Sequence, residues 1–217
     1  MLTRWVAVIA VLVASIAHAQ NAEIAATVTD ERGKPVADAV VIAVPSDGGI
    51  RVSARPREDI VDQVDKEFLP KVQAILVGTA VTFPNRDSVR HQVYSFSPAK
   101  RFELPLYEGV PRAVVFDKPG IVILGCNIHD WMVGYIYVSE SPYFAKTNAE
   151  GKAVLTDVPP RGYVVRIWHP KLAVAEEATR KNVEATRAQS VEVVWSVNLK
   201  PEVKIRRPAA GGQHGRY

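Results

Sequence analysis

The stretch "IVILGCNIHDWMVGYIYV", residues 121–138, holds the only cysteine of this chain, Cys126, between two β-branched apolar runs. On a β-strand, side chains alternate between two faces, so Val122, Leu124 and Cys126 share one face and the cysteine stands at the strand's end. A histidine follows after three residues and a methionine after three more. A short loop between two paired strands would therefore bring a thiol, an imidazole and a thioether to one place.

The rest of the chain has the same β-type pattern. Short β-branched runs alternate with turn signals such as "ERGKP", "SDGG", "AEGK" and "PPRG", which predicts an all-β fold of the sandwich type. Only residues 172–188, "LAVAEEATRKNVEATRA", suggest a turn or two of helix. The expected strands lie within residues 23–30, 38–45, 72–85, 91–97, 112–120, 121–126, 133–140, 152–159, 162–170 and 190–199.

The beginning of the chain predicts a secretory signal peptide. Arg4 precedes an apolar run over residues 5–16, and "AHA" at 17–19 is a small-residue cleavage site. We therefore expect cleavage after Ala19, a periplasmic or secreted protein, and no membrane span in the mature chain. The alternative is an uncleaved anchor, for which the apolar run is short, since a span needs about 20 residues.

Charge gives little indication of a partner. The chain has 27 Lys and Arg against 23 Asp and Glu, a formal net charge of +4. The basic residues are spread out, apart from "KIRRP" near the end, so nucleic-acid binding is not expected. The mild positive charge could help docking to an acidic redox partner, although plain solubility is the simpler explanation.

Export changes the interpretation of Cys126, because an oxidising compartment favours disulfides and this cysteine has no partner in the chain. A buried free thiol, an intermolecular disulfide and a metal thiolate remain as alternatives. Blue copper uses one thiolate, two imidazoles and a weak axial thioether. Cys126, His129 and Met132, at C-x2-H-x2-M spacing, would supply three of these four donors.

Three segments around this motif carry a family resemblance: "VGTAVTFPNRD" (77–87), "FDKPGIVILGC" (116–126) and "VGYIYV" (133–138). Together they resemble the cupredoxins, the blue-copper electron-transfer family. The resemblance implies a Greek-key β-sandwich, one type 1 copper ion, and a first histidine ligand just after an "N-x-D" turn, where His91 stands. His169, in "RIWHP", is expected to make a structural hydrogen bond, and His214 lies in the tail. The expected ligands are His91, Cys126, His129 and Met132.

Two further segments, 27–45 and 146–170, resemble the two halves of a carboxypeptidase regulatory-like, or transthyretin-like, β-sandwich. We therefore expect this sandwich over residues 20–56 and 141–199, a cupredoxin domain inserted at 57–140, and a disordered basic tail at 200–217. The combination also resembles secreted proteins labelled methylamine-utilisation proteins.

Four protein donors close the metal site, and catalysis by a metal needs an open position. G-x-S-x-G and H-E-x-x-H are absent. We therefore expect a one-electron carrier with a redox partner protein, not an enzyme. His129, beside Ile128 and Trp131, would be the electron port, with packing as the other role for Trp131. Copper delivery and a non-redox binding module are the alternatives. We expect four aromatic strand residues to be core: Tyr94, Phe96, Tyr135 and Tyr137.

Overall fold

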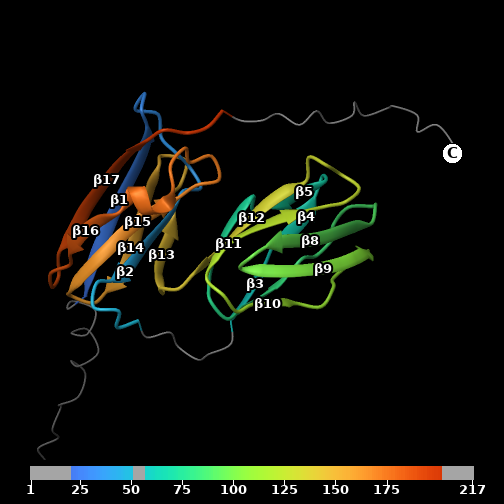
Figure 1. Cartoon of the computed structure of the whole chain (residues 1–217), viewed down its shortest axis with the longest axis horizontal. Coiled ribbons are helices and arrows are strands. Elements are labelled where there is room, and N and C mark those ends of the chain that lie inside the picture. Colours follow the sequence, from blue (N-terminus) through green and yellow to red (C-terminus); the bar gives the residue numbers. More distant parts are fainter. Residues whose placement is uncertain (1–20, 51–56, 202–217) are drawn as a thin grey trace, which may run out of the picture.

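The structure is a computed structural model that describes residues 21–50 and 57–201. The expected signal peptide and the tail from residue 202 lie outside the described residues. The all-β prediction is confirmed, and the strands form two β-sandwiches that lie side by side (Figure 1). Within the described ranges, no helix has the length and apolar character that a membrane span needs.

One sandwich is built from both ends of the described chain. Its first sheet has the order β14-β1-β17 and its second the order β13-β2-β15-β16. β1 is central, antiparallel to β14 and parallel to β17. These strands are β1 (Ala22–Asp30), β2 (Val40–Pro45), β13 (Tyr143–Lys146), β14 (Lys152–Val158), β15 (Gly162–Trp168), β16 (Lys181–Glu184) and β17 (Ser190–Val197).

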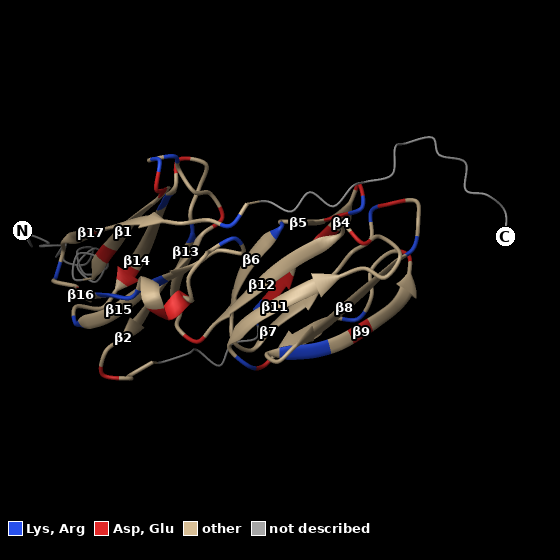
Figure 2. Cartoon of the chain, turned by 45° about the horizontal axis from the view of Figure 1, so that its top comes forward, with Lys and Arg blue, Asp and Glu red and all other residues tan. Residues whose placement is uncertain are grey.

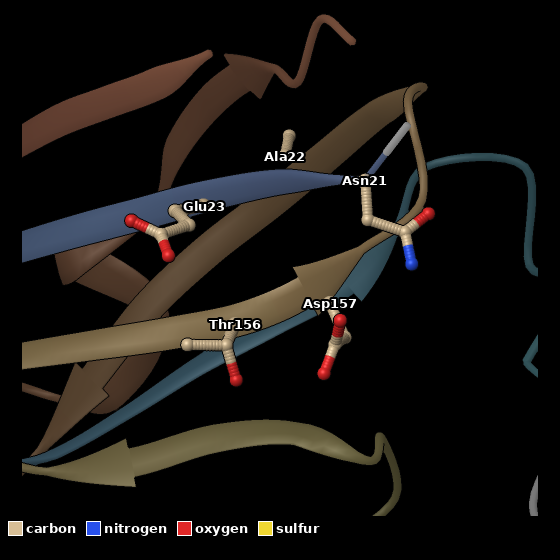
Figure 3. Close-up of a pocket in the computed structure, with 5 residues that line it drawn as sticks. All are labelled: Asn21, Ala22, Glu23, Thr156 and Asp157. Atoms are coloured by element: carbon tan, nitrogen blue, oxygen red, sulfur yellow. The ribbon is translucent and has the colours of Figure 1, made fainter. Parts of the chain in front are cut away.

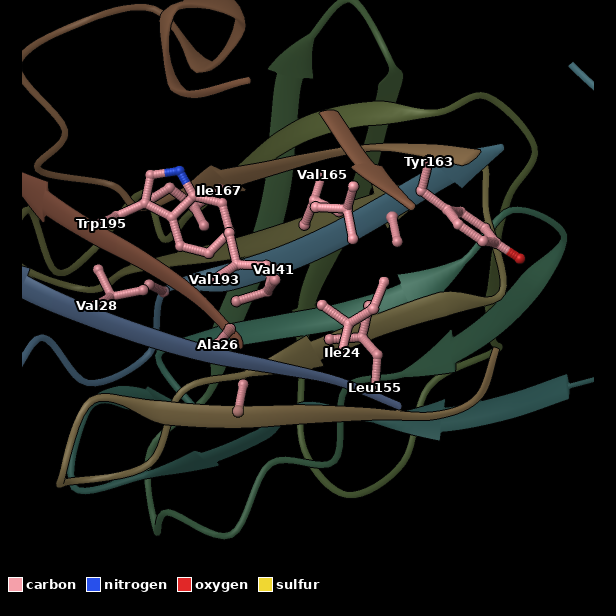
Figure 4. Close-up of a cluster of buried hydrophobic side chains, with 14 of the residues drawn as sticks. Ile24, Ala26, Val28, Val41, Leu155, Tyr163, Val165, Ile167, Val193 and Trp195 are labelled. Carbon is pink, nitrogen blue, oxygen red and sulfur yellow. The ribbon is translucent and has the colours of Figure 1, made fainter. Parts of the chain in front are cut away.

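The core of this sandwich follows from strand alternation. Ile24, Ala26 and Val28 on β1 are buried, while the residues between them are more exposed. They pack with side chains of β15 and β17, including the ring of Trp195, between the two sheets (Figure 4).

The other sandwich is built from the middle of the chain. Its smaller sheet has the order β10-β7-β3 and its larger sheet the order β6-β12-β11-β8-β9, with a separate β4–β5 hairpin. The strands are β3 (Arg57–Ile60), β4 (Asp62–Val64), β5 (Glu67–Leu69), β6 (Val72–Leu76), β7 (Thr79–Thr82), β8 (His91–Ser97), β9 (Lys100–Tyr107), β10 (Val114–Phe116), β11 (Gly120–Gly125) and β12 (Val133–Ser139).

β11 has the predicted alternation. Val122 and Leu124 are fully buried, Ile123 between them is 50% exposed, and Cys126 follows the strand on the buried face. β11 runs antiparallel to β12 from Gly120↔Val138 to Gly125↔Val133. The loop between these strands therefore lies at the same end of the sheet as His91, where β8 begins.

Strands that precede residue 46 and strands that follow residue 142 thus share sheets, while those between residues 57 and 139 form sheets of their own. The exact domain limits stay a prediction. A third buried cluster joins the two sandwiches and contains Val40, Ile42, Val72, Tyr137 and Trp168.

The predicted helical segment holds one turn of helix, the 3-10 turn η2 (Glu176–Thr179), followed by strand β16, because Val183 is buried where that strand pairs with β15. One expectation was wrong. Phe96 is not core: its side chain is 70% exposed on the outer face of β8.

Candidate metal centre

Three donor atoms meet at one end of the sandwich that is built from the middle of the chain. The Nδ1 atom of His91 lies 3.8 Å from the Sγ atom of Cys126, and the Nδ1 atom of His129 lies 3.9 Å from the same sulfur. The ligand atoms of the three residues all lie within 4.8 Å of one another. The two imidazole rings meet nearly edge to face, with centroids 5.0 Å apart. Both rings therefore turn the same nitrogen towards the thiol.

The two sulfur–nitrogen separations, 3.8 and 3.9 Å, fit one metal ion. Bonds of about 2.0 Å to nitrogen and about 2.3 Å to sulfur can bridge donors up to about 4.3 Å apart. One thiolate and two imidazoles are soft and intermediate donors, which suit copper better than Mg²⁺ or Ca²⁺. The donor set thus fits the group that the sequence implies.

Each donor is placed by a different piece of backbone. Cys126 directly follows β11, His91 begins β8, and His129 lies in the loop from β11 to β12. That loop is closed by a hydrogen bond from the backbone N–H of Met132 to the carbonyl of His129 at 2.9 Å. The loop is therefore short and fixed at its far end.

Met132 is buried in the same apolar cluster as Cys126, with 1% of its surface exposed. Its thioether as an axial ligand stays a prediction.

His91 has a carboxylate partner behind it. Its Nε2 atom lies 2.7 Å from the Oδ2 atom of Asp87. Asp87 also accepts hydrogen bonds from the backbone N–H groups of Asp65, at 2.7 Å, and Lys66, at 2.9 Å, at the tip of the β4–β5 hairpin. Burial alone would raise the pKa of Asp87, but the hydrogen bonds from His91, Lys66 and Asp65 hold it below its usual value. The carboxylate is therefore ionised at neutral pH.

The pKa of His129 is lowered by burial, and then by the nearby charges of His91 and Lys66. His129 is therefore neutral near pH 7, as a ligand must be. The three donors also differ in exposure: His91 is fully buried and Cys126 is 3% exposed, while His129 is partly exposed.

No protein-family model and no curated protein sequence matches this chain. Among solved structures, a purple cupredoxin from Nitrosopumilus maritimus is 30% identical; the similarity covers 38% of this chain and 99% of that one, with a TM-score of 0.33. A mutant amicyanin in its oxidised state is 18% identical, over 47% of this chain and 99% of that one, with a TM-score of 0.35. A copper-containing nitrite reductase from Thermus scotoductus SA-01 is 28% identical, over 53% of this chain but only 28% of that one, with a TM-score of 0.36.

These TM-scores are below one half, so the assignment of a fold to this chain rests on its own strands and side chains. A sandwich of two sheets carries the cysteine at a strand end and the two histidines at the same edge. This half of the chain is cupredoxin-like. The other sandwich stays unidentified.

The surroundings of His129 in the cupredoxin-like half are apolar on one side. Ile128 is 49% exposed, and the ring of Trp131 lies 5.1 Å from the imidazole, centroid to centroid. The Nε1 atom of Trp131 is buried without a hydrogen-bond partner. Packing beside the imidazole is therefore one role of Trp131 that the structure supports.

The other candidates form no site. His169 is buried outside the group, and its Nδ1 accepts a hydrogen bond from the backbone N–H of Lys171 at 3.2 Å, as predicted for a structural histidine. A pocket of about 340 Å³ opens where β1 begins and β14 ends, but it has no thiol or imidazole (Figure 3). Its lining residues are Asn21, Ala22, Glu23, Thr156 and Asp157. Lys and Arg (blue) and Asp and Glu (red) are interspersed along the described part of the chain in Figure 2.

Sequence reasoning missed two residues that hold the segment leading to His91. One is Asp87. The other is Asn85, whose Nδ2 donates to the carbonyls of Val89, at 2.8 Å, and Tyr107, at 3.1 Å. Both belong to the "N-x-D" turn, so the signal was present, but the turn was used only to locate His91.

Proposed function

We propose that this protein is an exported one-electron carrier whose redox centre is a type 1 copper ion. His91, Cys126 and His129 would hold the ion in a trigonal set, with Met132 as the weak axial donor. The observation that carries the proposal is the pair of Nδ1–Sγ separations just under 4 Å at a largely buried thiol. Copper bound there would supply a Cu(I)/Cu(II) couple.

Burial of the donors supports a carrier over a delivery protein. His91 and Cys126 are almost inaccessible to solvent, and both are placed by strands rather than by free loops. A rigid donor set changes little between the two oxidation states, which favours fast electron transfer. Delivery would instead need donors that an acceptor protein can reach and replace.

His129 is the route by which electrons would enter and leave. It is the most exposed of the three donors, and its neighbour Ile128 is half exposed. An apolar rim around a ligand gives a partner a surface that binds briefly, with little charge to desolvate. We propose that the redox partner docks at this rim. Export of the mature chain belongs to the same proposal, because its mild positive charge and predicted signal peptide suit a periplasmic carrier.

The test is the spectrum of the mature protein, residues 20–217, after addition of one equivalent of Cu(II). A type 1 centre would give intense blue or purple absorption and a narrow copper hyperfine splitting in the EPR spectrum. Cys126→Ser removes the thiolate and should abolish both. His169→Gln is the matched control, because this histidine is buried outside the group and its loss should leave the colour unchanged.

A colourless wild-type protein, or a spectrum that survives Cys126→Ser, would exclude the thiolate-bound centre. The chain would then be better explained as a two-sandwich binding module.

A further inference from the structure

We propose that Asp87, held by the tip of the β4–β5 hairpin, is a positioning residue that fixes the tautomer of His91 so that its Nδ1 lone pair faces Cys126. The role of His91 as a metal ligand rests on the proposed function. The positioning itself concerns only residues of this chain and can be measured without metal.

The first step is the direction of one hydrogen bond. Both side-chain oxygens of Asp87 accept backbone N–H groups, so Asp87 meets His91 as an acceptor, and the Nε2 atom of His91, 2.7 Å away, carries the proton between them. In a neutral imidazole the other nitrogen is then unprotonated. That nitrogen is Nδ1, the atom that lies 3.8 Å from the sulfur of Cys126. The carboxylate thus leaves a free lone pair on the side where a ligand is needed.

The second step is what holds the carboxylate. Both oxygens of Asp87 accept backbone N–H groups from the hairpin tip, one from Asp65 and one from Lys66. These donors belong to the main chain and cannot rotate away as a side chain could. The backbone N–H of Asp87 also donates to the Oδ1 atom of Asn85 at 2.9 Å. Asp87 is therefore fixed from three sides before it meets His91.

The third step is the shape of the tip. Asp65 and Lys66 have φ angles of 53° and 60°, in the left-handed region that residues other than glycine rarely adopt. Two successive residues of this kind make the tight two-residue turn that matches the twist of a hairpin. Neither position is glycine or asparagine. The two N–H groups aimed at Asp87 help to explain why the turn holds this conformation.

The fourth step is the anchoring of the hairpin. Phe68 on β5 is 1% exposed and packs in the same apolar cluster as Cys126 and Met132. On β4, the Nε2 atom of Gln63 donates to the carbonyl of Phe83 at 2.8 Å. The base of the hairpin is thus fixed in the core, and its tip reaches the residue behind His91. The contacts of the hairpin thus connect the core, through Asp87, to His91.

The neighbouring polar residue Gln92 does not hold the imidazole of His91. Gln92, next to His91 in sequence, points its amide at Glu103 on β9. The partners of the ring nitrogens of His91 are the sulfur of Cys126 and Asp87. Of these two partners, Asp87 makes the short contact, 2.7 Å against 3.8 Å for the sulfur, so we assign the selection of the tautomer to Asp87.

The substitution Asp87→Asn tests this selection. The amide keeps the shape of the carboxylate but turns one of its two ends into a donor. At the Oδ1 end that donor would face the backbone N–H of Asp65. At the Oδ2 end it would face both the backbone N–H of Lys66 and the Nε2–H of His91, and the imidazole can relieve its own conflict by moving its proton to Nδ1. The proton would then point at the site of the ligand lone pair. We expect Cu(II) affinity to fall by about 10- to 100-fold, as is typical when the partner of a ligand histidine is lost.

The experiment uses the mature chain without metal and long-range ¹H–¹⁵N correlation spectra in alkaline buffer, which distinguish the two tautomers directly. Wild type should show the proton of His91 on Nε2, and Asp87→Asn should show it on Nδ1. Lys66→Gly is the matched control at the tip, because it keeps the backbone N–H and the positive φ. Asp117→Asn is the control for loss of a carboxylate, since Asp117 pairs with Lys100 instead. Both controls should keep the wild-type tautomer.

Two results would overturn the inference. One is a wild-type protein with the His91 proton on Nδ1, a measurement that needs no variant to fold. The other is a folded Asp87→Asn protein that keeps the Nε2 proton and the wild-type Cu(II) affinity. If instead the tautomer switches as expected but wild type binds no copper, the positioning stands and the electron-carrier proposal fails.

Discussion

At the scale of single residues, the candidate site depends on one alternation. Leu124 and Cys126 point into the sandwich while Ile123 between them points out, so the only thiol of the chain is buried at a strand end. The same edge holds His91, because β8 is antiparallel to β11 and Gly125 pairs with Tyr94. A thiol that is buried, lacks a disulfide partner and faces two imidazole nitrogens is better explained by a metal than by packing.

Met132→Leu tests the axial donor. The two side chains have similar volumes, so the free energy of unfolding should change by less than about 1.5 kcal/mol. The blue absorption should remain, because the thiolate and both imidazoles remain. The reduction potential should rise, because loss of the thioether removes electron density from Cu(II) more than from Cu(I). Voltammetry on the copper protein measures this. An unchanged potential would show that Met132 is only a core residue.

His169 predicts a dependence of stability on pH that has nothing to do with the metal. Burial, and to a lesser extent the charge of Lys171, lowers the pKa of His169 from 6.5 to about 4, with Asp38 acting in the opposite direction. Because the folded-state pKa is the lower one, the unfolded chain takes up the proton first as the pH falls. The contribution of neutral His169 to the free energy of unfolding is complete above about pH 6.5. It is lost towards pH 4, by at most about 3 kcal/mol.

His169→Gln should remove this loss. Urea unfolding at pH values from 7 to 4 should show a shallower fall in the free energy of unfolding for the variant than for wild type. All other titratable groups are the same in both proteins, so the difference between the two curves isolates His169. Two parallel curves would contradict the assignment.

At the scale of elements, the β4–β5 hairpin is the piece that sequence reasoning could not find. Its tip, Asp65–Lys66, has no glycine, asparagine or proline, so the usual signals of a two-residue turn are absent. β9 was missed for another reason. Apolar residues do alternate with Arg101, Glu103 and Pro105 along the run from Lys100 to Tyr107, but none of its residues is fully buried or β-branched, and Pro105 argues against a strand.

The strand of the cysteine was predictable, in contrast, because a buried face alternates with an exposed one along β11. The histidine of the next loop and the first histidine were found from spacing and resemblance. The "N-x-D" turn marks Asp87 in the sequence, but its contact with the hairpin could not be predicted, because the two backbone N–H groups that it accepts lie 21 and 22 residues away along the chain.

Gly134→Ala tests how the hairpin is held. A Cβ atom at Gly134 on β12 would lie 2.8 Å from the Cβ of Phe68 and 3.1 Å from its Cγ. Phe68 is buried and cannot turn away, so β5 must move. We expect a loss of about 1–3 kcal/mol in the free energy of unfolding, measured by chemical denaturation. Gly49→Ala is the control, since its nearest neighbours are the side chains of Arg161 and Asp47 at an exposed turn. Equal stability of the two variants would mean that β5 does not pack tightly on β12.

At the scale of the whole molecule, the two sandwiches share a buried interface. Trp168 of β15 lies 5.9 Å from Tyr135 and 5.7 Å from Tyr137, ring centroid to ring centroid, and both tyrosines belong to β12. Polar contacts surround these rings. Arg166 bonds Glu140 at 2.6 Å and Glu176 at 2.5 Å, and the hydroxyl of Tyr137 donates to Glu176.

This interface lies on β12, the strand that follows the loop carrying His129. β12 begins directly after Met132, and its far half packs on the first sandwich. The second sheet of that sandwich thus holds one of the two strands that frame the loop. The unidentified sandwich therefore packs against β12 and supports it from one side.

Trp168→Ala tests whether the two sandwiches unfold together. The wild-type chain should unfold in one calorimetric transition, because each sandwich loses the apolar cover of the interface when the other unfolds. Removing the indole should cost about 3–5 kcal/mol, the usual range for a buried tryptophan. Each sandwich keeps its own core in the variant, so two separate transitions should appear.

Val154→Ala, at a half-exposed position of β14, is the control and should keep a single transition. A single transition in Trp168→Ala, with a loss below about 1 kcal/mol, would show that other contacts, such as those of Arg166, hold the two sandwiches together.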